Sequence, residues 1–173
     1  MKDAEYYYRQ GLRHNLTDYS TAFENYSKAI ARNPSCVDAY LRRGTLSYKI
    51  LKRYNEALVD FDKAIELNPD CAQAYLHRGI VKCHLLKFAE ALPDLDRAVE
   101  LDPNDERAFF NRGKNKYMLK YHEKEVRTDL EKAVLLGSVK AADMLKLFYG
   151  KDRESVRQAI KKGVKEKSKR LNK

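Results

Sequence analysis

The side chains best suited to chemistry lie in one short stretch that ends at His84. His77, Cys83 and His84 are metal ligands or nucleophiles by type, and a helix would bring the two histidines, seven residues apart, onto one face. Two imidazoles give half of a zinc-type site, but no carboxylate is placed to complete it. A lone cysteine in such a position is more often a small buried hydrophobe. We therefore predict no metal, no cofactor and no catalytic residue in this stretch.

Sequence motifs of catalysis are missing elsewhere as well. The chain contains no G-x-x-x-x-G-K-[ST], H-E-x-x-H or G-x-S-x-G pattern. The remaining histidines, His14 and His122, fall near predicted turns. The expectation is a protein that is not an enzyme.

Basic residues concentrate toward the C-terminal end of the sequence. The chain holds 35 Lys and Arg against 25 Asp and Glu, a net charge of +10. Residues 151–173 contribute ten basic and three acidic side chains, a net +7, and the other 25 basic and 22 acidic side chains leave +3. Such a segment can neutralise phosphates, so nucleic acid or an anionic membrane surface is an alternative partner. It has no aromatic residue to stack on bases, and charge runs of this kind are more often solvated ends.

One phrase recurs along the chain. SKAIARNP begins at Ser27, DKAIELNP at Asp62 and DRAVELDP at Asp96. Six landmarks recur around the phrase at steps of 33 to 35 residues. They are a glycine (Gly11, Gly44, Gly79, Gly113), an aromatic residue four before it (Tyr7, Tyr40, Tyr75, Phe109), a first small residue (Ala22, Ala57, Ala91, with Val126 fourth), a large apolar residue (Tyr26, Phe61, Leu95, Leu130), a second alanine (Ala29, Ala64, Ala98, Ala133) and a proline (Pro34, Pro69, Pro103).

Each copy predicts two helices joined by a short turn. Apolar residues suit a helix over residues 38–51, and over residues 55–67 they follow i, i+3, i+4, i+7 spacing. Gly44 and Ala57 are small, so the facing helices can approach while neighbouring Tyr and Phe fill the space beside them. The Asn-Pro step at residues 68–69 ends the second helix, because the residue before proline avoids α geometry. One hairpin cannot bury its apolar face alone, so the copies must stack.

This pattern resembles the tetratricopeptide repeat family, whose helix-turn-helix units are about 34 residues long. The resemblance covers residues 3–137, as four units at about 3–36, 37–71, 72–105 and 106–137. Residues 138–150 are expected to form a capping helix with Ser138 as N-cap and Gly150 at its end, covering the stack with Ala142, Leu145 and Phe148. Residues 151–173 form a basic extension, with a weakly amphipathic helix through Val156, Ala159 and Ile160. The expected fold is an all-α, right-handed α-solenoid.

The cysteines favour a cytoplasmic location. Cys36 and Cys71 follow the repeated proline, and equivalent positions in stacked repeats lie about 8–10 Å apart. A disulfide needs Cα atoms within about 7 Å, so all three cysteines are predicted to be free thiols. The segment MKDAEYYYRQ lacks the apolar stretch of a signal peptide, and no apolar run of about 18 residues would span a membrane.

The resemblance further implies that the first helices line a concave groove, with the groove-facing positions on either side of the repeated glycine. Carried over one by one, those positions hold Tyr8, Arg9 and Leu12; then Leu41, Arg42, Thr45, Tyr48 and Lys49; then Leu76, His77, Ile80, Cys83 and His84; and then Arg107, Phe110, Asn111, Lys114 and Tyr117. Apolar residues stand beside cationic and polar ones, which suits an extended peptide with acidic residues and a hydrophobic anchor. Arg43, Arg78 and Arg112 recur directly before each glycine and are predicted to be structural.

A chaperone-tail clamp is disfavoured. In this family that clamp uses Lys and Asn in one unit, Asn in the next, and Lys and Arg in the third. The corresponding places hold Tyr8, Leu12, Arg42, Gln73 and His77 in one frame, and Leu41, Thr45, His77, Arg107 and Asn111 in the next. Neither frame fits. The predicted function is therefore a non-catalytic adaptor or scaffold that binds a partner peptide or protein; the alternatives are association through the basic tail and a self-assembling scaffold.

Overall fold

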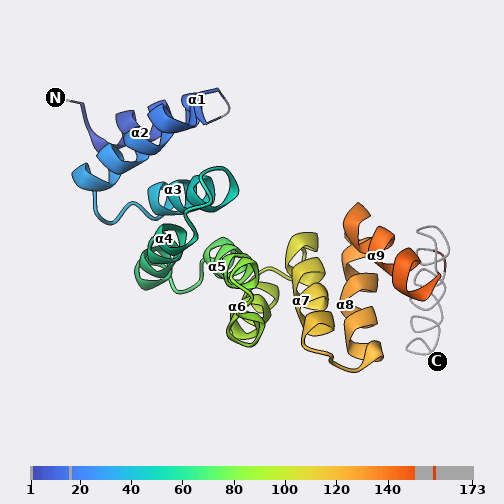
Figure 1. Ribbon diagram of the computed structural model, residues 1–173. Helices are drawn as coiled ribbons and strands as arrows, with labels where there is room; N and C mark the ends of the chain where they lie inside the picture. The colour runs from blue at the N-terminus through green and yellow to red at the C-terminus, as the bar shows by residue number, and fades with distance from the viewer. Residues whose placement is uncertain (1, 16, 151–157, 159–173) are drawn as a thin grey trace, which may run out of the picture. The chain divides into compact units, whose positions relative to one another are not determined.

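The structure is a computed structural model that describes residues 2–15, 17–150 and 158. In this part of the chain every regular element is an α-helix. The helices are α1 (Ala4–His14), α2 (Tyr19–Arg32), α3 (Val37–Lys49), α4 (Tyr54–Leu67), α5 (Ala72–His84), α6 (Phe88–Leu101), α7 (Glu106–Met118), α8 (Glu123–Leu135) and α9 (Val139–Tyr149). Successive helices pair into hairpins, α1 with α2 through α7 with α8, and α9 follows (Figure 1). The predicted all-α fold of helix-turn-helix repeats is confirmed.

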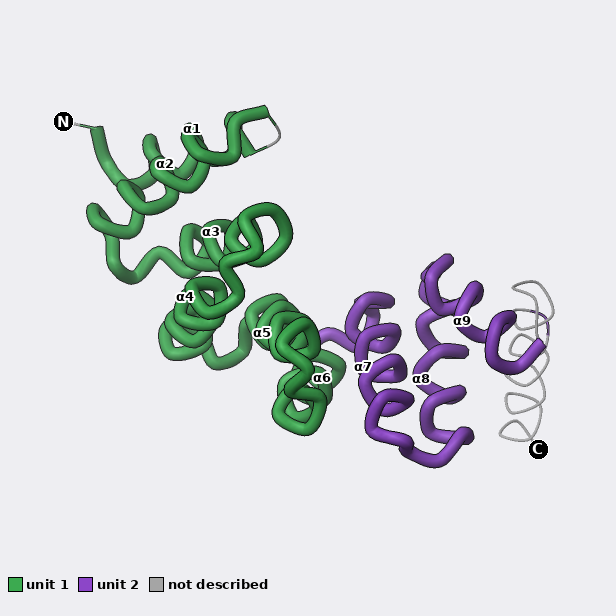
Figure 2. Tube along the Cα trace, viewed as in Figure 1, with its two compact units in different colours: residues 1–101 green, residues 102–173 purple. Residues whose placement is uncertain are grey.

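The chain divides into two compact units, Met1–Leu101 and Asp102–Lys173 (Figure 2). The first unit holds three hairpins, in which α2 packs on α3 and α4 packs on α5. The second holds the α7–α8 hairpin, with α9 packed on α8. Each hairpin thus contacts the next one in sequence within its unit, as stacking of repeats requires.

The repeated apolar residues form the core. All members of the first small series, the large apolar series and the second alanine series are buried, from Ala22, Tyr26 and Ala29 in the first hairpin to Val126, Leu130 and Ala133 in the last. The core of the first unit consists of small clusters between neighbouring helices, for example Tyr48, Ala57, Phe61 and Val81. Neighbouring hairpins of the first unit therefore share apolar clusters.

The repeated glycines set how closely the two helices of each hairpin approach. A Cβ atom added at Gly11 would lie 2.5 Å from the Tyr26 ring, and one added at Gly79 would lie 2.9 Å from Leu95. Gly113 is less tight, with a Cβ position 3.1 Å from Asp129. The large apolar side chain of the second helix thus fills the space that each glycine leaves, as the sequence predicted.

Hydrogen bonds to side-chain oxygens and residues with positive φ mark the ends of the helices. Asn68 ends α4 in an extended conformation, and its Oδ1 accepts a hydrogen bond of 3.1 Å from the Asp70 amide. In the second, third and fourth hairpins the turn between the two helices contains a residue with positive φ. These residues are Lys52 (57°), Leu86 (61°) and Lys120 (58°). Because of this turn α3 ends at Lys49, two residues before the predicted end.

The expected terminal helix is present as α9. The Ser138 hydroxyl accepts from the Ala141 amide, and Gly150 ends the helix with a φ of 64°. Ala142 and Leu145 are buried, as predicted. Phe148 remains 40% exposed and stacks on Tyr117 instead, with ring centroids 4.5 Å apart. The extension through Val156, Ala159 and Ile160 lies outside the described residues.

An arginine-aspartate pair ties the two helices of three hairpins together. Arg43 binds both carboxylate oxygens of Asp60, and Arg112 binds those of Asp129 in the same way. Each arginine also lies over the aromatic residue three positions earlier, as Arg78 does over the Tyr75 ring. The structural role predicted for these arginines is confirmed. Their carboxylate partners recur at the steps of the repeat but were not recognised from the sequence.

Two further properties concern the cysteines and the helices. Among the described residues, Cys36, Cys71 and Cys83 form no disulfide bond. Across the described residues, no helix has both the length and the apolar character needed to cross a lipid bilayer.

Candidate partner-binding surface

In the first unit, the first helices α1, α3 and α5 present the predicted groove residues with very different exposure. Arg9, Leu12, Arg42, Lys49 and His84 are exposed. The predicted residues Tyr8, Leu41, Thr45, Ile80 and Cys83 are half-buried. Arg9 pairs with Glu5 one helical turn away at 2.7 Å, an exposed pair of little energetic weight. The accessible part of this surface is therefore mainly cationic, with Leu12 as its most exposed apolar side chain.

Three predicted groove residues are buried. Leu76, Tyr48 and His77 are 1%, 4% and 7% exposed, respectively. The Tyr48 hydroxyl lies 3.0 Å from Nδ1 of His77, and the Phe61 ring stacks on the same imidazole at 5.6 Å. This contact joins α3 to α5 across two hairpins. These three side chains pack between helices. They would therefore shape the surface that a partner contacts and would make little direct contact with it.

A second aromatic contact closes the space between the same hairpins. The rings of Tyr54 and His84 stack at 5.4 Å with an angle of 15° between their planes. Tyr54 is the first residue of α4 and His84 the last of α5. The two histidines singled out in the sequence are thus both engaged by aromatic rings. No group of three or more metal-ligating side chains gathers anywhere in the described part of the chain.

In the second unit, α7 carries the other predicted groove residues. Arg107, Lys114 and Tyr117 are exposed, whereas Phe110 and Asn111 are half-buried. Arg107 binds both oxygens of Asp105, the N-cap residue of α7, at 3.0 and 2.6 Å. Burial opposes ionisation of Asp105, but the hydrogen bonds from Arg107 outweigh it and lower the pKa of the carboxyl group. Asn111 donates to the Arg107 carbonyl at 2.7 Å, within its own helix.

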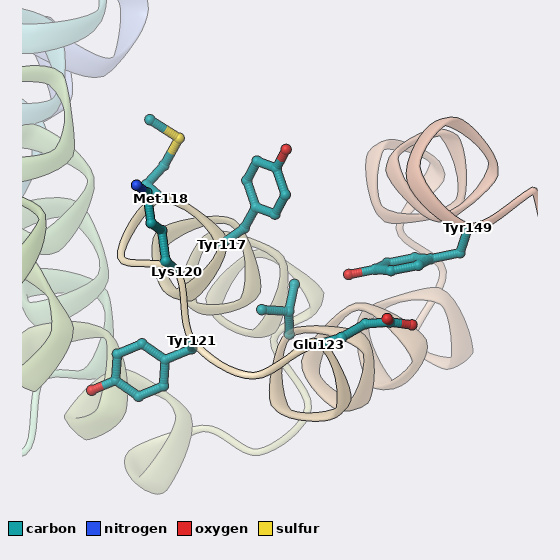
Figure 3. Close-up of a pocket in the computed structure, with 7 residues that line it drawn as sticks. Tyr117, Met118, Lys120, Tyr121, Glu123 and Tyr149 are labelled. Carbon is teal, nitrogen blue, oxygen red and sulfur yellow. The ribbon is translucent and has the colours of Figure 1, made fainter.

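A cleft that the sequence did not predict lies between the α7–α8 turn and the end of α9 (Figure 3). Its volume is about 550 Å³. It is lined by Tyr117, Met118, Lys120, Tyr121, Glu123, Val126 and Tyr149. Only Tyr117 among them was assigned to the predicted groove. A signal was present in the sequence, because the tyrosines at 117, 121 and 149 lie outside the repeated core positions.

A smaller hollow of about 250 Å³ lies between α2, α3 and α4, lined by Phe23, Arg43, Glu56, Val59 and Asp60. Its charged groups are largely engaged with one another. Arg43 pairs with Asp60, and Glu56 lies 3.7 Å from Arg53. This hollow is therefore a feature of the scaffold. The basic extension at 151–173 lies outside the described residues, Gln158 excepted.

Comparison with known proteins identifies the repeat. Residues 37–71 match the family model of the tetratricopeptide repeat. They correspond to α3, α4, the turn between them and the turn after α4. A comparison with curated proteins gives no match.

Solved structures with the same fold extend the likeness to most of the chain. The first tetratricopeptide repeat domain of Spaghetti (RPAP3), bound to the HSP90 peptide SRMEEVD, is 27% identical with a TM-score of 0.66, over 68% of this chain and 94% of that chain. YrrB, described as having an unusual peptide-binding site, is 25% identical with a TM-score of 0.70, over 84% of this chain and 75% of that chain. MamA from Desulfovibrio magneticus RS-1 shares the fold. It is 21% identical with a TM-score of 0.74, over 95% of this chain and 96% of that chain. The chain thus contains a tetratricopeptide repeat at residues 37–71 and shares its fold with solved tetratricopeptide repeat proteins.

Proposed function

We propose that the protein is a non-catalytic adaptor that holds an extended peptide segment of a partner protein on the face formed by α1, α3 and α5. The observation that supports this proposal is that cationic side chains on α1 and α3 are exposed, namely Arg9, Arg42 and Lys49. His84, at the end of α5, is exposed as well. Leu12 and the half-buried Leu41 and Ile80 add apolar surface beside the charges. A peptide with acidic residues and one hydrophobic anchor complements this combination.

Two relatives support peptide binding as the use of this fold. The Spaghetti (RPAP3) domain is bound to an HSP90 peptide that contains two glutamates and a C-terminal aspartate, and YrrB carries a peptide-binding site. This chain lacks the side chains of the chaperone clamp at the equivalent positions, so the proposed ligand is recognised by its internal acidic and apolar residues. An intracellular location, in the cytoplasm, agrees with cysteines that form no disulfide bond among the described residues.

A peptide-array screen of the full chain tests the proposal. The Arg42→Glu variant should bind acidic hits at least about tenfold more weakly, because a cation that attracts the peptide becomes a repelling anion. Lys28→Glu is the matched control, since Lys28 is exposed on α2, a second helix, and the change in charge is the same. Lys114→Glu tests whether α7 also contributes. Hits that bind all three variants and the wild type equally would contradict the assignment of the surface.

Self-association is a second candidate, favoured by one observation. Leu147 on α9 is 78% exposed, and its neighbour Phe148 is 40% exposed. Copies of the chain would cover these side chains on contact. Light scattering at increasing protein concentration tests this, with Leu147→Lys as the variant that should keep the protein monomeric.

A further inference from the structure

The cleft of the second unit lies at a place where, in the first unit, two aromatic side chains stack on each other. Between α4 and α5 the stacked rings of Tyr54 and His84 fill this space. At the first position of α8 the corresponding residue is Glu123. Helix α9 has 11 residues where α5 has 13, so it ends at Tyr149 before reaching the position of His84. The result is an open site with a carboxylate in place of a ring.

The walls of this cleft combine aromatic faces with one acidic group. Tyr149 extends from α9 toward Glu123, and Tyr117 stands across the open space from it (Figure 3). Lys120 also lines the cleft, but its side chain extends toward Met118, away from the Glu123 carboxylate (Figure 3). Glu123 is the acidic group next to the two rings, and Arg127, 3.9 Å from its carboxylate, offsets part of its charge. Partial burial raises the pKa of the Tyr149 hydroxyl, Glu123 and Tyr117 raise it further, and Arg127 lowers it.

The two rings are held by contacts of their own. Tyr117 stacks on Phe148 with ring centroids 4.5 Å apart and an interplanar angle of 26°. Phe148 meets Tyr149 edge-on at 6.5 Å. Among the described residues, the cation paired with Glu123 is Arg127, at the long distance of 3.9 Å, and Arg127 lies closer to Glu131, at 3.4 Å. The two aromatic rings are thus already in position before a ligand binds. The Glu123 carboxylate can form a shorter ion pair with a bound cation than it forms with Arg127.

We propose that this cleft binds the alkylammonium end of a lysine side chain of a partner protein. Aromatic faces attract cations through their ring quadrupole, and the attraction grows when the cation leaves bulk water. The Glu123 carboxylate adds an ion pair, and the four-carbon stem of lysine packs against Met118, which is 46% exposed. A neutral apolar side chain would shield Glu123 from water without giving it a partner, which costs free energy. This site is separate from the peptide surface proposed on α1, α3 and α5.

Nuclear magnetic resonance on the full chain tests the proposal with two small probes. Nα-acetyl-lysine methylamide should shift the resonances of Tyr117, Glu123 and Tyr149 in a saturable titration. The norleucine analogue, which keeps most of the apolar stem but lacks the ammonium group, should bind at least about tenfold more weakly. Glu123→Gln should weaken the lysine probe by a similar factor, whereas Glu125→Gln, an exposed position in the same first turn of α8 outside the cleft, should leave it unchanged.

Tyr149→Leu provides a second variant that removes an aromatic wall without touching the carboxylate, and it should also weaken the lysine probe. Thermal unfolding of each variant checks that α8 and α9 remain folded. Equal binding of the lysine and norleucine probes would overturn the proposal, as would unchanged binding by Glu123→Gln. So would a wild-type chain that gives no saturable shift, including one whose own basic segment already occupies the cleft.

Discussion

Arg78 on α5 donates two hydrogen bonds to the carboxylate of Asp94 on α6, from Nε at 3.0 Å and from Nη2 at 2.5 Å. Lys82 reaches the same carboxylate at 2.7 Å. Asp94 is buried, so both cations compensate the loss of its hydration. The hairpin is therefore joined by a charge network as well as by its apolar core.

Replacing Asp94 by Ala should destabilise the protein by about 3 kcal/mol, because two partly buried cations would lose their partner. Asp62→Ala is the matched control. Asp62 also binds Arg78, at 2.6 Å, but its side chain is 59% exposed, so its loss should cost less than about 1 kcal/mol. Urea unfolding of both variants measures the difference. Similar losses in the two variants would mean that the buried position of Asp94 has no special weight.

Tyr26→Phe should stabilise the protein by about 1 kcal/mol. The Tyr26 ring is fully buried, and its hydroxyl has no hydrogen-bond partner among the described residues. Burial raises the pKa of this hydroxyl from 10.0 to about 12. The wild type should therefore lose stability as pH rises from 10 to 12, by about 1.4 kcal/mol per pH unit, because the unfolded chain ionises first.

The phenylalanine variant lacks that titration, so its stability advantage should grow over the same pH window. Tyr75→Phe serves as the control for general tyrosine effects, since Tyr75 is only half-buried. Unfolding curves at several alkaline pH values give the comparison. If the free energy of unfolding has the same pH dependence in the wild type and in Tyr26→Phe, then Tyr26 ionises in the folded state as readily as in the unfolded state.

Gly11→Ala should destabilise the protein more than Gly113→Ala. The new Cβ would lie 2.5 Å from the rigid Tyr26 ring in the first case, and 3.1 Å or more from its nearest neighbours in the second. We expect a net loss of about 2 kcal/mol at Gly11, since overpacking outweighs the helix propensity of alanine. At Gly113 the two effects should nearly cancel. Thermal unfolding midpoints test this order.

Leu86→Gly should stabilise the protein by about 1 kcal/mol. Leu86 has a φ of 61°, a left-handed conformation that glycine adopts without the strain of a side chain. Its side chain is 75% exposed, so little apolar burial is lost. Leu85→Gly, one residue earlier, is the control, because Leu85 packs against the core and has no positive φ. Opposite signs of the two changes in the free energy of unfolding are expected.

The sequence was sufficient for the repeat and its core because those features depend on residue size. Close packing of two helices requires small residues at Gly44 and Ala57 and a large one at Phe61. This order of sizes recurs along the chain at the step of the repeat. The buried aspartates also recur, at Asp60, Asp94 and Asp129. They escaped notice because a charged residue on an amphipathic helix ordinarily indicates exposure, and only the contact with arginine reveals burial.

The surface was harder to predict because exposure of a first-helix residue depends on the neighbouring hairpin. His77 stands at a groove position by register, yet Tyr48 and Phe61 from the preceding hairpin cover it. The cleft in the second unit depends on where α9 ends and on which residue begins α8. Neither property follows from the repeat pattern, since both are departures from it.

The first hairpin departs from the charge network of the others, with the neutral Gln10 and Asn25 at the places of the arginine and the aspartate. Asn25 donates instead to the Thr21 carbonyl in its own helix, at 2.9 Å. A stack held by contacts between neighbours opens from its weakest end. Backbone amides of α1 and α2 should therefore exchange their hydrogens sooner than those of α3 to α6, and a protease that requires an opened chain would cut there first.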